Sequence, residues 1–480
     1  MNNNSVGDDI KYLKENYDFL YEDIDTSDDL FDDGGMSKRS HNDTNSDIIE
    51  SENLSISDLF DKTNPENKEG NDIDDNAFVD IDKKSNFVYK SNKYDKKMKE
   101  MMKKYCKTKD YVPLILPKAD RILVLGDVHG DFKLVLTMLT MGNVLGKKKK
   151  EVMVDGKKKM QNYYYWTGGD TIVVQVGDQV DRCRPTVRPS NCDQEGVTVN
   201  DEDSDVKILK FFNKLNDQAM LSGGRVISLL GNHELMNAMG DIRFVSKKGL
   251  DGMKNYKDKN GYAIDDGKKA RIYAFSPGNE YANLMGCTRS SLIIVGSNLF
   301  VHGGLIDVFL NMINENKKYD SVESLVKIDY MIKKWLFGLY QNNEKIEDYV
   351  TGLIQYPDSL FWTRALGQIP YEVDENYVDC KKAKEVFEIN IFEKMNISHI
   401  IIGHTPQAFQ HSHGINATCG NKIWRVDNGS SMAFNNYDNN YLRNKNNDTK
   451  NTYVLFDTNR LPQVLEILDD KKFNIIKMKF

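Results

Sequence analysis

The sequence lacks any run of apolar residues that approaches the length of a membrane span. A helix that crosses a bilayer needs about 20 consecutive, mostly apolar residues. The chain starts with MNNNSVGDDIKYL, which also lacks the basic start and apolar core of a secretory signal peptide. We therefore expect a cytoplasmic or nuclear protein that has no membrane partner.

Cysteine is scarce, and the six cysteines are scattered rather than grouped. Their spacing shows neither a disulfide framework nor the paired thiolates of a structural zinc site. This absence predicts a reducing compartment. The six residues are Cys106, Cys183, Cys192, Cys287, Cys380 and Cys419.

Negative charge is concentrated at one end of the chain. Residues 1–90 contain 24 acidic and 9 basic side chains, a balance of −15, whereas residues 91–480 contain 48 acidic and 56 basic ones, or +8. Apolar residues are few in the acidic part, which predicts a largely disordered tail. A solvated tail is the simplest interpretation. Its short apolar clusters could instead fold on a partner, or its carboxylates could enter a cationic site and inhibit it.

Lysine-rich segments follow the acidic tail. Residues 91–117 are predicted to form a solvated linker helix. Clustered lysines can attract nucleic acid or an anionic membrane, but no aromatic platform or arginine-rich face accompanies these. We therefore do not expect a nucleic-acid partner. Further lysines flank Asp155-Gly156, which is a strong two-residue turn signal, and they predict an inserted β-hairpin at 146–166.

From residue 121 onwards the sequence alternates between strand-like and helix-like patterns. The apolar run 121–127 ends in Gly-Asp, and residues 132–142 have the spacing of a helix with one buried face. This alternation predicts an α/β fold. Further strands are expected at 171–178, 225–234, 291–304, 399–405, 422–429 and 452–458.

Five short glycine-bounded segments end apolar runs and contain residue types that bind metals. Each segment alone is weak evidence, because Gly-Asp after a strand is usually a turn or a helix cap. The combination is more specific, since four of the eight histidines fall within these segments. They are GDVHG (126–130), GDQVDR (177–182), GNHE (231–234), HGG (302–304) and GHTP (403–406).

Carboxylate and imidazole groups at several strand ends suit a pair of divalent cations. Two cations roughly 3.5–4 Å apart can both generate a nucleophile and neutralise the charge that develops when a phosphoester is attacked. The mixed oxygen and nitrogen donors favour Mn, Fe or Zn over Ca. Asp127 and His129 alternate along one turn and can face a first metal, while Asp178 can bridge to a second.

The order of these motifs resembles that of the calcineurin-like metallophosphoesterase superfamily. Four longer stretches are similar to the Shewanella-like protein phosphatases, a bacterial-type branch of the protein serine/threonine phosphatases. The resemblance covers about residues 118–435, with unmatched insertions between the motifs. The four stretches are GNHELMNAMGDIRFVS (231–246), NLFVHGGL (298–305), LFWTR (360–364) and IIIGHTPQ (400–407).

The resemblance also implies an architecture. Two mixed β-sheets would pack face to face, flanked by helices, in a catalytic domain at 118–480. A helical run within 306–370 is expected to form a cap over the site, although its apolar face could simply belong to the core. The domain would carry insertions at 146–166, 183–204 and 306–370.

The family's ligand roles can be carried over position by position. The resemblance implies that Asp178 is shared between the metals. Pro406 stands where the wider superfamily often has a further histidine, so water would complete metal one. The implied ligands are Asp127, His129 and Asp178 for metal one, and Asp178, Asn232, His302 and His404 for metal two.

Four further residues resemble the family's catalytic groups. His233 corresponds to the general acid that protonates the leaving oxygen, and Asp181 to the carboxylate that orients its imidazole. Arg182 and Arg364 correspond to the guanidinium groups that hold phosphate oxygens.

One position departs from the family pattern, because Cys183 follows Arg182 where glycine is usual. A tolerated substitution is the simpler interpretation. A thiol beside a cationic centre could instead have a lowered pKa and be open to oxidation. Cys192 is expected to pair with Cys183 only transiently.

These observations predict a metal-dependent phosphomonoesterase that acts on phosphoprotein by direct attack of metal-bound hydroxide. Phosphoserine, phosphothreonine and phosphotyrosine all remain open as substrates. A dinucleoside polyphosphate hydrolase is the main alternative, because it would use the same metal core. A non-catalytic metal-binding protein that recruits partners through its acidic tail is the second.

Overall fold

The computed structural model describes residues 92–106, 112–154, 157–185, 187, 189–315, 320–392, 394–435 and 458–478. The chain divides into two compact units, and the described parts of the smaller one are residues 149–154 and 157–163. The acidic tail expected at 1–90 lies outside the described residues. So does the strand expected at 452–458, apart from its last residue.

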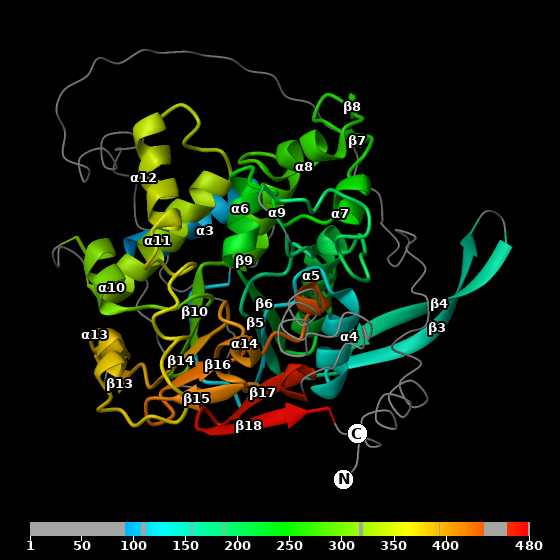
Figure 1. Ribbon diagram of the computed structural model, residues 1–480. Helices are drawn as coiled ribbons and strands as arrows, with labels where there is room; N and C mark the ends of the chain where they lie inside the picture. The colour runs from blue at the N-terminus through cyan, green and yellow to red at the C-terminus, as the bar shows by residue number, and fades with distance from the viewer. Residues whose placement is uncertain are drawn as a thin grey trace, which may run out of the picture. The chain divides into compact units, whose positions relative to one another are not determined.

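The first of two six-stranded sheets holds the amino-terminal motifs (Figure 1). In spatial order it consists of β18 (Lys472–Lys477), β17 (Gln463–Leu468), β2 (Arg121–Leu125), β5 (Ile172–Gln175), β6 (Arg225–Leu229) and β9 (Arg289–Ser290). Strands β2, β5, β6 and β9 run parallel to one another. Strand β17 pairs antiparallel with both β2 and β18, so the sheet is mixed.

The second sheet holds the carboxy-terminal motifs. In spatial order it consists of β1 (Ile115–Leu116), β10 (Leu292–Val295), β11 (Asn298–Val301), β14 (His399–Ile402), β16 (Ile423–Arg425) and β15 (Asn416–Thr418). Strands β11, β14 and β16 are parallel, and β10 and β15 are antiparallel to their neighbours β11 and β16. The predicted fold class, α/β with two mixed sheets and flanking helices, is confirmed.

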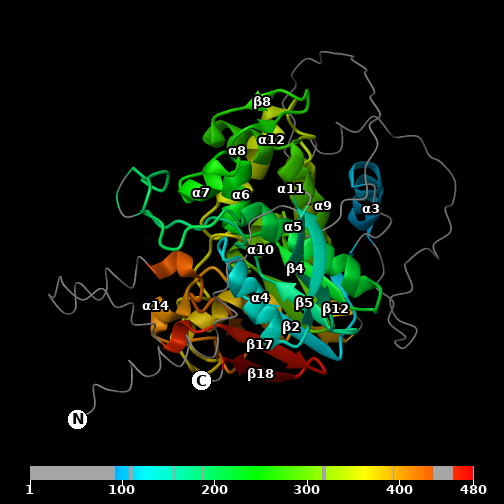
Figure 2. The ribbon, with the colours of Figure 1, turned by 90° about the vertical axis from the view of Figure 1, so that its right-hand side faces the viewer.

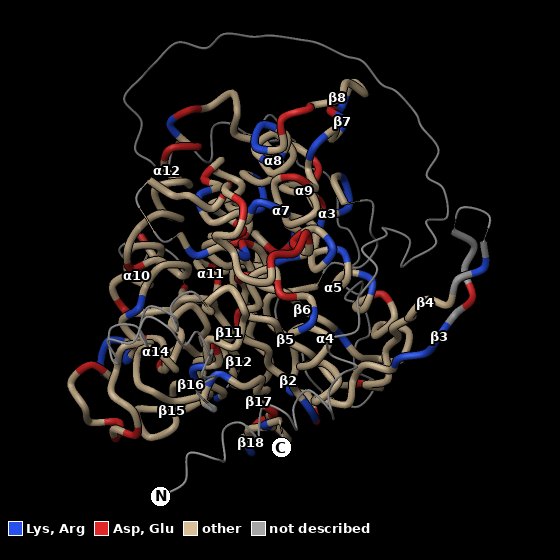
Figure 3. Tube along the Cα trace, turned by 45° about the vertical axis from the view of Figure 1, so that its right-hand side comes forward, with Lys and Arg blue, Asp and Glu red and all other residues tan. Residues whose placement is uncertain are grey.

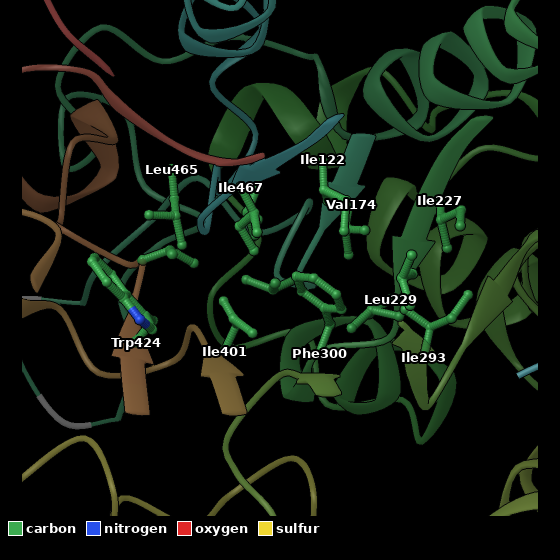
Figure 4. Packing of buried hydrophobic residues seen from close by; sticks show 14 of the residues in the cluster. Ile122, Val174, Ile227, Leu229, Ile293, Phe300, Ile401, Trp424, Leu465 and Ile467 are labelled. Carbon is green, nitrogen blue, oxygen red and sulfur yellow. The ribbon is translucent and has the colours of Figure 1, made fainter. Parts of the chain in front are cut away.

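A single apolar core joins the two sheets (Figure 4). Ile122 and Val174 from the first sheet face Phe300 and Ile401 from the second, and all four side chains are fully buried. Strands buried on both faces read as continuous β-branched and aliphatic runs rather than alternating ones. This explains why the apolar runs before the motifs were recognisable, and why each motif begins where its strand leaves the core.

Helices cover the sheets and extend beyond them (Figure 2). The first helix after β2 begins at Asp131, whose carboxylate accepts a hydrogen bond from the Leu134 amide, as helix caps do. The helices that follow α3 (Lys93–Tyr105) are α4 (Phe132–Met141), α5 (Asp205–Met220), α6 (Asn232–Ala238), α7 (Lys247–Asp251), α8 (Gly267–Phe275), α9 (Glu280–Thr288), α10 (Asp307–Ile313), α11 (Ser321–Leu336), α12 (Glu344–Gln355), α13 (Lys384–Phe387) and α14 (Gln407–His411).

Shorter elements complete the described chain. Two small antiparallel pairs join β7 to β8 and β12 to β13. Their bounds, with those of three 3₁₀ helices, are β7 (Tyr256–Lys257), β8 (Ala263–Ile264), β12 (Asn390–Phe392), β13 (Met395–Asn396), η2 (Val378–Ala383), η3 (Met432–Phe434) and η4 (Thr458–Arg460).

A lysine-rich pair of strands occupies the segment where a hairpin was expected. Strands β3 (Leu145–Val154) and β4 (Lys157–Trp166) form a two-stranded sheet, and lysines mark its length in Figure 3. The expected turn at Asp155-Gly156 lies outside the described residues. At the base of the pair, the Trp166 amide donates to the Gln218 side chain of α5.

The helix expected at 91–117 is α3 (Lys93–Tyr105). It starts with a capping box, in which Asn92 and Asp95 each accept a hydrogen bond from the other's backbone amide. Met98 is fully buried and packs against Phe337. This face of the helix is therefore buried rather than solvated as predicted, because its methionines form an apolar stripe among the lysines.

Helix α11 carries the amphipathic run that the sequence predicted to be a cap. Leu325, Ile332 and Trp335 on its apolar face are at most 2% exposed. Asp329 accepts the amide of Ser291 beside β9, and Lys333 donates to the Arg289 carbonyl. Bonds to the sheet edge and deep burial favour the core interpretation over the cap.

All six cysteines are paired, which contradicts the prediction of scattered, unpaired thiols. The disulfides join Cys106 to Cys287, Cys183 to Cys192 and Cys380 to Cys419, with sequence separations of 181, 9 and 39 residues. These unequal separations form no regular pattern in the sequence, because the paired cysteines come together only in the folded protein. Scattered cysteines therefore do not support a reducing compartment here. Among the described residues, no helix is long and apolar enough to cross a membrane.

His399, the first residue of β14, is expected to make stability depend on acid pH. Its ring packs against Phe473, and burial lowers the pKa of His399 to about 4 from its ordinary value of about 6.5. At pH values between these two pKa values, His399 is protonated in the unfolded chain but neutral in the folded chain. The free energy of unfolding therefore falls as pH drops from about 6.5 to 4. Denaturant titrations across this range should show a shallower decline in His399→Gln. Equal slopes would contradict the prediction.

Candidate active site

The five glycine-bounded motifs meet where strands of the two sheets end. Asp127 and Asp178 follow β2 and β5, and the GNHE motif follows β6, all in the first sheet. His302 and His404 follow β11 and β14 in the second. Parallel strands place their carboxyl ends at the same edge of a sheet. Two clusters of buried histidine and aspartate side chains form there and share Asp178.

The loops at this edge hold an unusual backbone conformation. Four site residues other than glycine have a positive φ: His129 (45°), Asp178 (54°), Asp181 (75°) and His404 (64°). Such conformations cost on the order of 1–3 kcal/mol each and are kept where the surroundings enforce them, often at functional sites. This strain could not be predicted from the sequence, because none of the four residues is the glycine that such positions favour.

Glu234, the last residue of the GNHE motif, fixes the loop that carries Asp178. Its fully buried carboxylate accepts hydrogen bonds from the backbone amides of Asp178 (2.9 Å), Gln179 (2.7 Å) and Gly231 (2.7 Å). One side chain thus ties the end of β5 to the end of β6. The motif marks the position of Glu234 in the sequence, but its role could not be predicted, because that role depends on contacts with the loop after β5.

The first cluster contains His129, Asp178 and His233. The His129 Nε2 atom lies 3.8 Å from Asp178 Oδ2 and 3.9 Å from Asp127 Oδ2. The other ring nitrogen of His129 faces the Val180 carbonyl at 3.3 Å. The two distances from Nε2 to the carboxylates are longer than direct hydrogen bonds, so Nε2 is not hydrogen-bonded to either of them. The predicted ligands of metal one are therefore brought together.

The second cluster contains Asp178, His302 and His404. The His302 Nε2 atom lies 2.9 Å from Asn232 Oδ1 and 3.3 Å from Asp178 Oδ1. Its Nδ1 atom lies 2.9 Å from the Val176 carbonyl, an arrangement that places the proton on Nδ1 and leaves Nε2 for a metal. All the ligands predicted for metal two thus converge.

Burial and charge at this edge suit bound cations. Burial raises the pKa of Asp127 well above its ordinary value, and the neighbouring carboxylates Asp427 and Asp178 raise it further. Burial also opposes ionisation of Asp178, but the adjacent His302 and His233 hold the pKa of Asp178 well below its ordinary value. Several carboxylates crowded at one buried edge favour divalent cations, which would neutralise them. The donor set fits two such ions.

Asp427 is a site residue that the sequence analysis missed. It is 2% exposed, and its Oδ2 atom has no hydrogen-bond partner among the described residues. Its Oδ1 accepts the Gly429 amide at 2.9 Å, and its Cα would lie 3.2 Å from a Cβ on Gly126, the neighbour of Asp127. Burial raises the pKa of Asp427 to about 6. The signal was an aspartate just beyond β16, in the same position as Asp127 beyond β2.

His233 is held by a chain of buried polar groups. Its Nδ1 atom lies 2.7 Å from Asp181 Oδ2, and Asp181 Oδ1 accepts a hydrogen bond from Asn237 at 2.9 Å. Asn237 in turn accepts one from Arg271, which pairs with Asp205. These hydrogen bonds fix the imidazole ring of His233 so that its Nε2 atom lies 3.9 Å from Asp178 Oδ2 in the first cluster. The predicted pair of His233 and Asp181 is therefore in contact.

The two arginines predicted to bind phosphate lie in different surroundings. Arg364 is exposed, and its Nη1 donates to the His404 carbonyl at 2.7 Å, which places it beside the second cluster. Arg182 is 2% exposed and forms ion pairs with Asp131 (3.3 Å) and Glu202 (3.1 Å). No hydrogen bond or ion pair described for Arg182 reaches either cluster. Glu202 belongs to the insertion that begins at Cys183, so its ion pair with Arg182 could not be predicted from the motif.

Comparison with known proteins places this geometry in a family. A family model described as calcineurin-like phosphoesterase matches residues 120–408. An uncharacterised protein of Acanthamoeba polyphaga mimivirus is 33% identical over 279 residues, which cover 56% of this chain and 98% of that protein. Shewanella-like protein phosphatase 2 of Arabidopsis thaliana is 27% identical over 346 residues, 66% of this chain and 73% of that protein.

A solved structure is also similar to the chain, at low sequence identity. The cold-active protein-tyrosine phosphatase of a psychrophilic Shewanella species has a TM-score of 0.43 and 18% sequence identity, over 77% of this chain and 83% of that one. The family model covers more than half of the chain, from β2 to α14, and includes every strand end that contributes to the two clusters. The chain therefore belongs to the calcineurin-like phosphoesterase family.

Proposed function

We propose that the protein is a dinuclear metal-dependent phosphatase that hydrolyses phosphomonoesters on proteins. The observation that supports this most is the pair of buried clusters that share Asp178. Two cations bridged by one carboxylate would activate water and neutralise the charge that develops on the phosphoryl oxygens. Relatives in Arabidopsis thaliana and Plasmodium berghei that are named Shewanella-like protein phosphatases support a phosphoprotein substrate.

The protein's own residues would position and protonate the reacting groups. His233 would donate the proton on Nε2 to the leaving oxygen, because Nδ1 is engaged by Asp181 at 2.7 Å. Asp181 would keep that tautomer and stabilise the charged ring. Glu234 would hold the strained loop that presents Asp178. The buried carboxylates of Asp127, Asp178 and Asp427 would help to hold the metals between turnovers.

The test of this proposal is a panel of substrates with added manganese. Matched phosphoserine, phosphothreonine and phosphotyrosine peptides should release phosphate, and diadenosine tetraphosphate should not be cleaved. The matched control is Asp178→Asn, which should release no phosphate from any of them. Hydrolysis of the dinucleotide alone would instead support the dinucleoside polyphosphate alternative. Metal binding after reconstitution without hydrolysis of any of these substrates would favour the non-catalytic one.

A further inference from the structure

A buried arginine that none of the five motifs contains lies close to the pair of His233 and Asp181. Arg271 belongs to α8, which packs against α6, the helix that starts within the GNHE motif (Figure 1). Its side chain is fully buried, and its guanidinium carbon lies 4.0 Å from the centre of the Phe275 ring, one turn further along α8. Arginine stacks well on aromatic faces and keeps its charge there. The packing therefore holds this guanidinium in one place.

Two hydrogen bonds fix the direction of the guanidinium. Its Nε atom donates to Asn237 Oδ1 at 2.8 Å, and its Nη2 atom donates to Asp205 Oδ2 at 2.8 Å. The same Nη2 atom lies 3.7 Å from Asp181 Oδ1. Asp205 also contacts the loop after β5, because its Oδ1 atom accepts a hydrogen bond from the Asp181 amide at 3.2 Å. Arg271 and Asp205 thus restrain both the side chain and the backbone of Asp181.

The bond from Arg271 decides which way the Asn237 amide points. A guanidinium has only donors, so the atom of Asn237 that faces it must be the oxygen. The Nδ2 atom of Asn237 then has two protons for two acceptors, Asp181 Oδ1 and the His233 carbonyl, both at 2.9 Å. Without Arg271 the amide could turn over and point its oxygen at the Asp181 carboxylate. Arg271 therefore ensures that Asn237 donates to Asp181.

The Asp181 carboxylate transmits this restraint to the proposed general acid. Asn237 holds Oδ1, which leaves Oδ2 directed at His233 Nδ1, 2.7 Å away. An imidazole held in this way presents Nε2 to the leaving oxygen. Asp181 is fully buried and Asp205 is 3% exposed, and buried charges are stable only when they are paired. Arg271 supplies the positive charge that these two carboxylates need.

We propose that Arg271 is a positioning residue of the phosphatase reaction, which acts on His233 through Asn237 and Asp181. The hydrogen bonds described for Arg271 go to Asn237 and Asp205 rather than to the two metal-binding clusters, so its role is indirect. The inference rests on the proposed function, because it links Arg271 to proton transfer in that reaction. It also gives α8, which lies between the GNHE motif and β9 in the chain, a part in catalysis.

The leaving group of the substrate provides the test. We would measure kcat on a phosphoserine peptide, whose alkoxide needs a proton, and on p-nitrophenyl phosphate, whose phenolate leaves without one. Arg271→Gln should lower kcat on the peptide by on the order of 10- to 100-fold, the effect of a lost hydrogen bond to a charged group. Its kcat on p-nitrophenyl phosphate and its metal content should change little. Arg271→Lys should recover part of the peptide rate, because lysine keeps the charge without the two-pronged donor.

Two comparisons separate positioning from a general loss of stability. Arg425 is also fully buried, and it donates to the Asn416 side chain and the Ile369 carbonyl at the second sheet. Arg425→Gln should lower the melting temperature without changing the ratio of the two rates. The double variant of Arg271→Gln and His233→Asn should cleave the peptide no more slowly than His233→Asn alone. A wild-type ratio of rates in Arg271→Gln, or losses that multiply in the double variant, would overturn the assignment.

A spectroscopic measurement tests the same link without relying on activity. In protein reconstituted with zinc, which is diamagnetic, and labelled in its histidine nitrogens, the proton between His233 Nδ1 and Asp181 should give a downfield signal that is missing in His233→Asn. Arg271→Gln should shift or weaken this signal, whereas Arg425→Gln should not. An unchanged signal would overturn the assignment.

The remaining outcomes are also decisive. If the wild-type protein hydrolyses no phosphoester, the proposed function fails, and the signal alone decides whether Arg271 positions His233. If Arg271→Gln does not fold, the same measurements are made on Arg271→Lys. A wild-type ratio of rates together with an unchanged signal in that variant would then overturn the assignment.

Discussion

Replacing Asp178 with asparagine is expected to abolish activity and empty both metal positions. Asp178 belongs to both buried clusters, with Oδ1 at 3.3 Å from His302 Nε2 and Oδ2 at 3.8 Å from His129 Nε2. An amide keeps the shape but removes the negative charge that two cations would share. Loss of outer partners alone weakens metal binding roughly 10- to 100-fold, so loss of this shared ligand should exceed that. Metal content by elemental analysis and phosphate release would both be measured.

The fold should survive this substitution, because asparagine can keep the bond that Asp178 Oδ1 accepts from the His233 amide at 3.0 Å. A suitable control is Asp193→Asn, which alters an aspartate paired with Lys268 at the surface. That variant should keep its metal and its activity. Full metal occupancy in Asp178→Asn would contradict the shared-ligand arrangement.

The α/β alternation and the convergence of the motif residues could be predicted from the sequence because both follow from local patterns, whereas the two-sheet architecture and the ligand roles were implied by the resemblance. Each ligand motif directly follows a buried strand, as Asp127 follows β2 and His404 follows β14, so periodicity and motif together place it at a sheet edge. The ligand positions also needed no knowledge of the insertions. The same local signal exists for Asp427, which follows β16 as Asp127 follows β2.

The rest depended on contacts between distant segments. Arg182 is engaged by Glu202, which belongs to an insertion that no motif describes. Cys106 and Cys287 are 181 residues apart and meet only because α3 packs against the helices near Phe337. The apolar face of α11 was visible in the sequence, but periodicity alone cannot say whether such a face covers a site or fills a core. These three features depend on which distant segments meet in the folded protein, so they could not be predicted from local sequence patterns.

Replacing His233 with asparagine is expected to reduce turnover strongly while metal content stays near normal. General acid catalysis by a positioned side chain typically contributes about 10²- to 10⁴-fold, and kcat should fall within that range. Asp181→Asn should lower kcat less, because Asn237 would still be close and His233 could keep part of its orientation. Equal loss of metal in His233→Asn and Asp127→Asn would show instead that His233 is a ligand. The membership of His233 in the first cluster makes that comparison necessary.

The leaving group separates these two roles more sharply than metal content does. An acid that protonates the departing oxygen matters most for an alkoxide, such as that of serine, and little for p-nitrophenolate, which leaves without a proton. His233→Asn should therefore lose far more activity on a phosphoserine peptide than on p-nitrophenyl phosphate. A metal ligand acts before the bond breaks, so its loss would lower both rates by the same factor. Asp181 only orients the ring, so Asp181→Asn should also lose more activity on the phosphoserine peptide than on p-nitrophenyl phosphate, but by a smaller ratio. An equal loss of activity on both substrates would show that Asp181 supports the metal site rather than proton transfer.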